Sequence, residues 1–330
     1  MRRREFTALL GGLAAWTFEA SAQQPREKRV VAVLQDLAEN EPVAQAEVAA
    51  FRATLAKLGW TEGDNVRIEV AWGAGDPDRI QELAKTLVGL RPDAIIARGT
   101  PATRALASAT RTIPIVFVVV ADPLGAGFAD SLARPGRNIT GFSNLFSSLA
   151  AKWVELLKEI APQTERVALL FNPDTLAPLQ LFMPSIQTVA ATLGVRVSTS
   201  PVQAASEIEG VFDALARDSG SGLIVMPDGF NLANREVIVA MSSRYRVPTI
   251  YFNAAFFAKS GGLITYGPDF VEYYRLAAGY IDHILRGRRP EDLPIQQPTN
   301  FQLVINLKTA RQIGLRVPPT LLARADEVIE

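Results

Sequence analysis

The sequence of 330 residues predicts an α/β protein, built as two doubly wound parallel-sheet lobes that are joined by a multi-strand hinge. Three observations lead to this fold class. From residue 29 onward, short apolar runs alternate with amphipathic stretches, which is typical of βαβ units. The alternation starts again near residue 149. After residue 262 too few elements remain for a third unit.

The first lobe opens with residues 30–34, a β-branched run suited to a strand buried on both faces. The helix that follows places its apolar residues on one face and ends at Gly59. An Asp-Pro dipeptide at residues 76–77 marks the entry of the second helix. The predicted strands of this lobe are 30–34, 66–72, 94–97, 115–120 and 139–142, and the predicted helices are 43–58, 79–90 and 102–110.

The second lobe repeats this order of elements without a close repeat of sequence. Helical patterns again connect apolar runs, so its strands are expected to be parallel with right-handed crossovers. The predicted helices are 149–160, 179–193, 205–218 and 231–245, and the predicted strands are 166–171, 195–199, 222–226 and 249–252.

The C-terminal part holds one long helix over 270–285, with a short strand or crossing segment at 263–266, a strand at 301–305 and a last helix from residue 307. Such a tail can only complete the two lobes, so we expect the chain to cross between them more than once. Several crossings form a hinge that closes two lobes over a cleft. The domain prediction is an N-terminal lobe of 29–141 plus 265–287 and a C-terminal lobe of 142–264 plus 288–330.

Residues 1–22 read as an export signal rather than as part of the fold. Three arginines at positions 2–4 precede a weakly apolar run over 7–18, and Ala20-Ser21-Ala22 supplies the small residues of a cleavage site. The Arg3-Arg4-x-Phe6 pattern favours the twin-arginine route, with the general secretory route as the alternative. We therefore expect a periplasmic protein that is cleaved near Ala22. Beyond this segment no apolar run is long enough for a membrane span.

Composition excludes several classes of function. The 34 basic and 34 acidic residues balance, whereas a nucleic-acid partner would call for a concentrated basic surface. The chain has no cysteine, so neither a disulfide framework nor a lipid-anchored cysteine is expected. With one histidine and no cysteine, a zinc or copper site is not expected either. We predict no metal and no cofactor.

The sequence offers little for catalysis. It contains no G-x-S-x-G elbow, no phosphate-binding P-loop and no G-x-G-x-x-G that opens a helix after a strand. Its only histidine, His283, lies in an apolar helical stretch, where a catalytic triad is not expected. The prediction is therefore that the protein is not an enzyme.

Several long strings resemble the ABC transporter substrate-binding protein family. They are residues 100–103, 113–117, 122–123, 131–141, 247–251, 261–267, 303–310 and 318–327. The resemblance covers essentially all of residues 29–330. It implies the type I periplasmic binding fold, an aromatic or other apolar amino acid as ligand, and permease subunits in the membrane as partners. Many relatives carry a lipid-anchored cysteine that is absent here.

Ligands of open α/β sheets bind beyond the carboxyl ends of the strands. The segment Gly99, Thr100, Pro101, Ala102 and Thr103 follows a strand and opens a helix, with proline at its first position. Its free amides and the Thr100 hydroxyl could hold a carboxylate, or Thr100 could merely cap the helix. The other candidates, all at or near strand ends or lobe crossings, are Gln35, Asp36, Asp122, Ser143, Asn144, Asn172, Asp228, Tyr251, Asn253 and Tyr266.

Each of these candidates also has a purely structural interpretation. Asp122 could pair with a ligand ammonium or form an Asp-Pro turn, and Asn172 and Asp228 could form Asx turns. Tyr251 could stack on a ligand ring or pack in the core. Taken together, the residues favour an extracytoplasmic solute-binding component of an ABC importer that closes over a small solute. The alternatives are a ligand-sensing periplasmic module for a receptor and, more remotely, a periplasmic enzyme.

Overall fold

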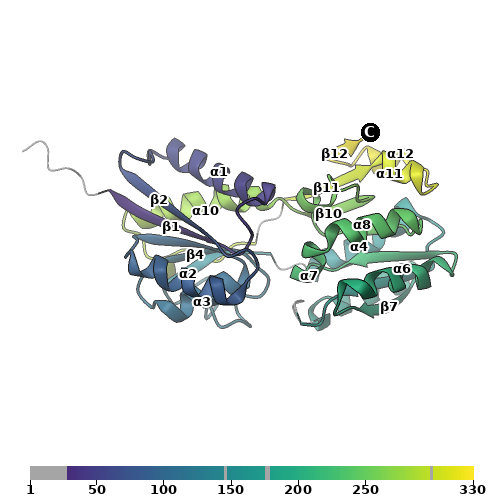
Figure 1. Cartoon of the computed structure of the whole chain (residues 1–330), viewed down its shortest axis with the longest axis horizontal. Helices are drawn as coiled ribbons and strands as arrows, with labels where there is room; N and C mark the ends of the chain where they lie inside the picture. The colour runs from purple at the N-terminus through teal and green to yellow at the C-terminus, as the bar shows by residue number, and fades with distance from the viewer. Residues whose placement is uncertain (1–27, 145–146, 175–178, 298–299) are drawn as a thin grey trace, which may run out of the picture.

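The computed structural model describes residues 28–144, 147–174, 179–297 and 300–330. The predicted signal peptide lies outside the described residues. Within them the chain forms two α/β lobes side by side (Figure 1), which confirms the fold class expected from the sequence. No helix in the described ranges combines the length and the apolar character that a membrane crossing requires.

The first lobe is a five-stranded parallel sheet in the order β2-β1-β3-β4-β5. Two helices from the beginning of the chain, α2 and α3, cover one face, and α1 packs with the late helix α10 on the other (Figure 1). The bounds are β1 (Arg29–Gln35), α1 (Pro42–Lys57), β2 (Val66–Trp72), α2 (Pro77–Gly89), β3 (Ala94–Arg98), α3 (Gly99–Ala109), β4 (Ile115–Val120), β5 (Ile139–Ser143) and α10 (Phe270–Leu285).

The second lobe is a seven-stranded sheet in the order β12-β11-β10-β9-β8-β6-β7, in which only the pair β10 and β11 is antiparallel. Its elements are α4 (Ser147–Ile160), β6 (Arg166–Phe171), η1 (Leu179–Leu181), α5 (Met183–Thr192), β7 (Arg196–Pro201), η2 (Ala205–Glu207), α6 (Ile208–Ala216), β8 (Ser221–Val225), α7 (Gly229–Ala233), α8 (Arg235–Arg244), β9 (Thr249–Tyr251), α9 (Ala254–Phe257), β10 (Ile264–Pro268), β11 (Phe301–Asn306), α11 (Leu307–Gln312), α12 (Pro319–Leu322) and β12 (Glu327–Ile329).

Three predicted helices of this lobe are shorter than the sequence pattern indicated. The helix expected over 205–218 is the 3-10 turn η2 followed by α6. The helix expected over 231–245 is divided at Asn234 into α7 and α8, and Asp228 caps the first of them by accepting a hydrogen bond from the Asn231 amide. The helix expected over 179–193 is a 3-10 turn followed by α5, because Pro184 in the first turn of α5 has no amide to continue a helix from residue 179.

The chain passes between the lobes after β5, after β10 and before β11. Strand β10 pairs with β9 at residues 264 and 265 and with β11 as far as Pro268, so residues 264–268 lie in the second lobe. The segment after α10, which holds the 3-10 turn η3 (Pro290–Asp292), packs on the first lobe, where the Leu293 carbonyl accepts a hydrogen bond of 2.7 Å from Thr140 Oγ1. The predicted boundary at 264/265 therefore lies after β10, because strand pairing places β10 in the second lobe. The predicted boundary at 287/288 lies later in the chain, because the segment after α10 packs on the first lobe.

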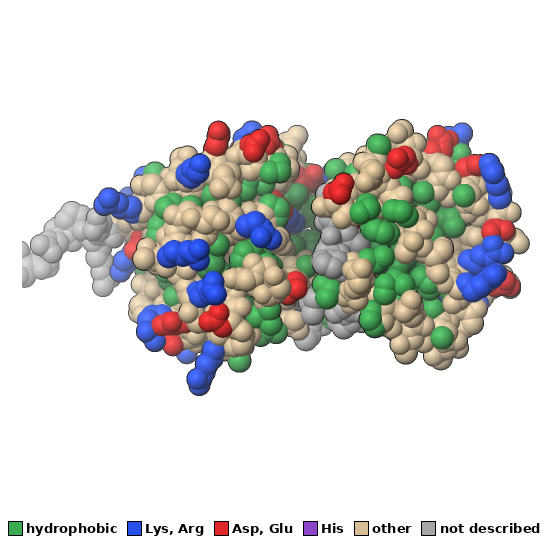
Figure 2. Space-filling model, turned by 90° about the horizontal axis from the view of Figure 1, so that it is seen from below, with side chains coloured by type: hydrophobic (Ala, Val, Ile, Leu, Met, Phe, Trp, Pro, Cys, Tyr) green, Lys and Arg blue, Asp and Glu red, His purple; other side chains and the backbone are tan. Residues whose placement is uncertain are grey.

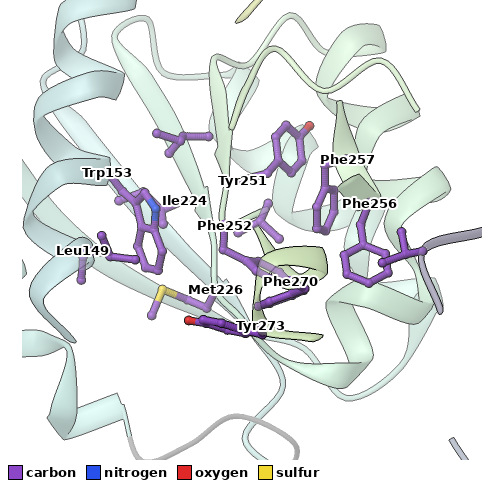
Figure 3. Close-up of a cluster of buried hydrophobic side chains, with 14 of the residues drawn as sticks. Leu149, Trp153, Ile224, Met226, Tyr251, Phe252, Phe256, Phe257, Phe270 and Tyr273 are labelled. Carbon is purple, nitrogen blue, oxygen red and sulfur yellow. The ribbon is translucent and has the colours of Figure 1, made fainter. Parts of the chain in front are cut away.

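An apolar cluster continues from one lobe into the other at the hinge. Figure 3 shows Phe252 and Phe256 of the second lobe beside Phe270 and Tyr273 of α10. The rings of Phe256 and Phe270 lie 6.2 Å apart in an edge-on arrangement. All four side chains are buried. The start of α10 is thus held by aromatic packing from the opposite lobe.

Candidate ligand-binding site between the lobes

The parallel strands of the two sheets end toward each other, at the waist of the molecule (Figure 1). The surface is hollowed there, and acidic side chains lie at the rim of this hollow on both lobes (Figure 2). Carboxyl ends of parallel strands are where open α/β sheets bind ligands. The space between the lobes is therefore the candidate site.

A network of three charged side chains lies at the strand ends of the first lobe. Arg98, the last residue of β3, donates to Glu47 through Nε at 2.9 Å and through Nη2 at 3.2 Å. Its Nη1 donates to Asp36 Oδ1 at 2.7 Å. The side chains of Arg98 and Glu47 are 4% and 0% exposed, while that of Asp36, which directly follows β1, is 22% exposed. We call these residues the Arg98 network.

The surroundings of the Arg98 network explain its ionisation. Burial raises the pKa of Glu47 above its usual value, although the adjacent Arg98 guanidinium lowers it. Burial alone would lower the pKa of Arg98, but Asp36 and Glu47 outweigh it and raise that pKa above its already high value. The Arg98 guanidinium also lies 5.6 Å from the ring centre of Phe270. Arg98 is therefore a fixed cation between two carboxylates.

Two wholly buried polar atoms beside the network lack hydrogen bonds of ordinary geometry in the described part of the chain. They are Gln35 Oε1 and the Tyr274 hydroxyl oxygen. The other end of the Gln35 amide, Nε2, donates to Glu47 at 3.4 Å. Burial and the nearby Glu47 raise the pKa of Tyr274. Gln35 and Asp36 were predicted to lie at the site, and the structure brings both of them to the Arg98 network.

The predicted carboxylate site is the start of α3. No side chain caps this helix, and the hydroxyl of the half-buried Thr100 makes no hydrogen bond with the described residues. Thr103 donates to the Gly99 carbonyl at 2.8 Å, and it is buried with Ala102, so neither side chain faces the space between the lobes. Pro101 is exposed. Gly99 has φ +76, and a side chain there would collide with the Asp36 carboxylate.

Three further candidates of the first lobe lie nearer the hinge. Asp122 Oδ1 accepts a hydrogen bond of 2.8 Å from the Gly125 amide, which is the turn that its structural interpretation predicted. Ser143 and Asn144, at the end of β5, are buried, and their Oγ and Oδ1 atoms lack partners among the described residues. They mark the first crossing between the lobes.

In the second lobe, Asn172 and Asp228 serve to connect two loops. Asp228 Oδ1 accepts from the Asn231 amide at 2.7 Å, and its Oδ2 accepts from the Asn172 amide at 3.1 Å and from Asn231 Nδ2 at 3.0 Å. Asn172 Oδ1 accepts from the Asp174 amide at 2.8 Å in an Asx turn. Both side chains are buried. This arrangement fixes the loops that follow β6 and β8.

The other candidates of the second lobe also have internal partners. Tyr251 is fully buried, stacks on Phe257 with ring centres 4.7 Å apart, and shares a 2.9 Å hydrogen bond with Ser242 (Figure 3). Burial raises the pKa of its hydroxyl. Asn253 caps α9 and donates to the Pro268 carbonyl at 2.8 Å. The half-buried Tyr266 ring contacts Phe301, with ring centres 5.8 Å apart.

One ion pair joins the lobes directly. Arg235, the first residue of α8, donates through Nη2 to Glu41 at 3.0 Å, and Glu41 immediately precedes α1 in the other lobe. The two side chains are 24% and 18% exposed. The pair therefore bridges the space between the lobes with limited access to solvent.

The sequence prediction did not include Glu47 and Arg98, although each is a charged residue within an apolar pattern. Glu47 occupies a position on the apolar face of α1, between Ala44 and Phe51. Arg98 ends the buried strand β3 immediately before Gly99, where the prediction began its site. A buried charged side chain needs a partner of opposite charge, and Glu47 and Arg98 are partners of each other. No group of three or more His, Cys, Asp or Glu side chains in the described ranges could hold a metal ion.

A family model shows to which family the chain belongs. A sequence model described as ABC transporter substrate binding protein matches residues 30–329. The chain is 24% identical over 283 residues to a protein named tyrosine-binding protein from Clostridioides difficile, which covers 86% of this chain and 80% of the relative.

Two solved structures share the fold over nearly the whole length. A conserved domain protein from Vibrio cholerae is 29% identical with a TM-score of 0.81, and the match covers 92% of this chain and 100% of that one. An ABC domain from Streptococcus pneumoniae, solved in complex with L-Trp, is 25% identical with a TM-score of 0.80 and the same coverage.

Proposed function

Because the chain belongs to the ABC transporter substrate-binding protein family, we propose that it is the exported, periplasmic solute-binding component of an ABC importer. In this role it captures a small solute between its lobes and delivers it to permease subunits in the membrane. A separate ATPase supplies the energy, and the protein itself catalyses no reaction and needs no cofactor. The observation that carries the proposal is the Arg98 network, which lies at strand ends that face the opposite lobe.

The proposed ligand is an amino acid, aromatic or otherwise apolar. Two relatives support it, since one is named for tyrosine and the other was solved with L-Trp. The start of α3 supports it physically, because uncapped amides at a helix N-terminus and the free Thr100 hydroxyl suit a carboxylate. Tyr251 is an unsuitable stacking partner, because its ring and hydroxyl are both engaged in the core.

Closure of the lobes is the step that the ligand must drive. A ligand shifts the equilibrium between open and closed forms only by the difference in its affinity for the two. Contacts that exist only when both lobes touch the ligand supply that difference. The crossings of the chain between the lobes provide the hinge for such a motion.

A thermal-shift screen of the protein without residues 1–22 tests the proposal. The panel contains the standard amino acids, sugars, nucleosides and small organic acids. A ligand present at a hundred times its dissociation constant should add about 2.7 kcal/mol to the free energy of unfolding. Calorimetry then gives the affinity of each hit, and mass spectrometry shows that the ligand is unchanged. A sugar or nucleoside as the only hit would overturn the amino-acid assignment, and turnover of the ligand would overturn the binding role.

A further inference from the structure

We propose that Asp36 receives the ammonium group of the ligand, and that Arg98 and Glu47 are positioning residues that hold its carboxylate at the edge of the cleft. This assignment rests on the proposed function, because it states which group of a bound amino acid meets the first lobe. It predicts a protein that selects solutes with a positively charged nitrogen.

The order of the three side chains in depth supports this assignment. Glu47 is fully buried, Arg98 is 4% exposed, and Asp36 is 22% exposed. A solute that enters between the lobes therefore meets the carboxylate of Asp36 before it meets the guanidinium of Arg98. A site built for an anion would present these charges in the opposite order.

The balance of charge points the same way. Two carboxylates surround one guanidinium, so the Arg98 network has one negative charge in excess when all three groups are ionised. Charges removed from water need a partner of opposite sign. An ammonium group supplies a positive charge and three donors.

The hydrogen bonding of Asp36 also leaves one of its oxygen atoms available for this ammonium group. Its Oδ1 is fixed by the 2.7 Å hydrogen bond from Arg98, while its Oδ2 has no hydrogen bond with the described residues. The carboxylate lies against Gly99, at the start of α3. In an α-amino acid the ammonium and carboxylate groups are carried by the same carbon atom. A ligand with its carboxylate at the start of α3 therefore has its ammonium beside Asp36.

Pairs of ligands that differ only in the ammonium group test the assignment. The probes are L-tyrosine against 3-(4-hydroxyphenyl)propionate and L-tryptophan against indole-3-propionate, measured by calorimetry. The wild type should bind the better amino acid on the order of 10- to 100-fold more tightly than its ammonium-free analogue, as expected for a charged hydrogen bond. Asp36→Asn keeps the acceptor for Arg98 and removes the charge. It should weaken amino-acid binding by a similar factor and leave the analogue unchanged.

The matched control is Glu39→Gln, which neutralises an exposed carboxylate in the loop that follows Asp36 and should keep the wild-type ratio. Equal losses for both members of a pair in Asp36→Asn would assign Asp36 a structural role only. A wild type that binds both members equally would overturn the assignment without any variant. Failure of the wild type to bind either amino acid would overturn the proposed ligand class, and this assignment with it.

Discussion

Glu47 stands where the apolar stripe of α1 predicts an aliphatic side chain, and its neighbours Ala44, Val48 and Phe51 are all buried. The carboxylate is tolerated there because Arg98, at the end of β3, donates two hydrogen bonds to it. Buried ion pairs seldom add much stability relative to an apolar pair, since both partners lose their hydration. The pair is thus better explained by the site that it supports than by stability.

Removing one partner of this pair has a different consequence. In Glu47→Ala the Arg98 guanidinium stays buried with only Asp36 as its counter-charge. We expect the free energy of unfolding to fall by about 3–5 kcal/mol. Urea unfolding followed by circular dichroism measures the change. The control is Asp213→Ala, which breaks an exposed pair with Arg217 and should alter stability by less than about 1 kcal/mol. Equal effects of the two variants would contradict this account.

Part of the site could be predicted at this scale. Gln35 ends and Asp36 follows an apolar strand, so the expected topology alone placed both of them at the candidate site. Glu47 and Arg98 could not be assigned, because their pairing joins positions 51 residues apart. The candidates of the second lobe were weaker, since Asn and Asp after a strand have the same sequence pattern whether they meet a ligand or cap a helix. Asp228 and Asn253 cap helices here.

Strand β10 leads into the crossing before α10 and passes very close to the end of β9. A Cβ at Gly267 would overlap the backbone carbonyl of Phe252, which cannot swing aside as a side chain could. In α10, by contrast, a Cβ at Gly279 would meet no atom within 4 Å. The close approach of the backbone therefore requires glycine at position 267, whereas the space around position 279 does not.

Substitution by alanine should therefore change the free energy of unfolding in opposite directions at the two positions. Gly267→Ala should lower the free energy of unfolding by about 1–3 kcal/mol, because the backbone must move to admit a methyl group. Gly279→Ala should raise it by about 0.5–1 kcal/mol, because alanine is the better helix former. Denaturant unfolding of both variants, with the wild type as reference, gives the signs. A stabilising Gly267→Ala would show that the approach of the two strands is looser than described.

Most of the helices and strands could be predicted from the sequence, because β1, β3, β6 and β8 have the length and the continuous apolar character of buried parallel strands. The C-terminal part, from residue 263 onward, was harder to assign to a lobe. Whether Leu263 and the residues after it start a strand of one lobe or the other depends on pairing with β9 and β11, and no local pattern encodes that register.

Besides the covalent crossings and the aromatic packing at the start of α10, the ion pair of Glu41 and Arg235 connects the two lobes. In Arg235→Gln we expect a broader distribution of distances between the lobes. The change in the free energy of unfolding should stay below about 1 kcal/mol, because the pair is partly exposed. Because the chain has no native cysteine, spin labels at Glu82→Cys and Ala214→Cys report this distance by pulsed electron resonance.

The control for this measurement is Arg275→Gln, which breaks an ion pair with Glu272 within α10. It should leave the distribution of distances unchanged. Identical distributions for Arg235→Gln and the wild type would mean that the pair of Glu41 and Arg235 exerts no restraint on the arrangement of the lobes.

Helix α10 packs on the five-stranded sheet of the first lobe, but more than a hundred residues of the other lobe are encoded between this sheet and α10. During synthesis, which adds about 5–20 residues per second, one face of the first sheet is therefore covered by α1 alone while most of the second lobe emerges from the ribosome. The first lobe is thus made first but cannot be finished until most of the second lobe has been made, and a nascent chain stopped before residue 270 would present the side of α1 that α10 later covers to chaperones.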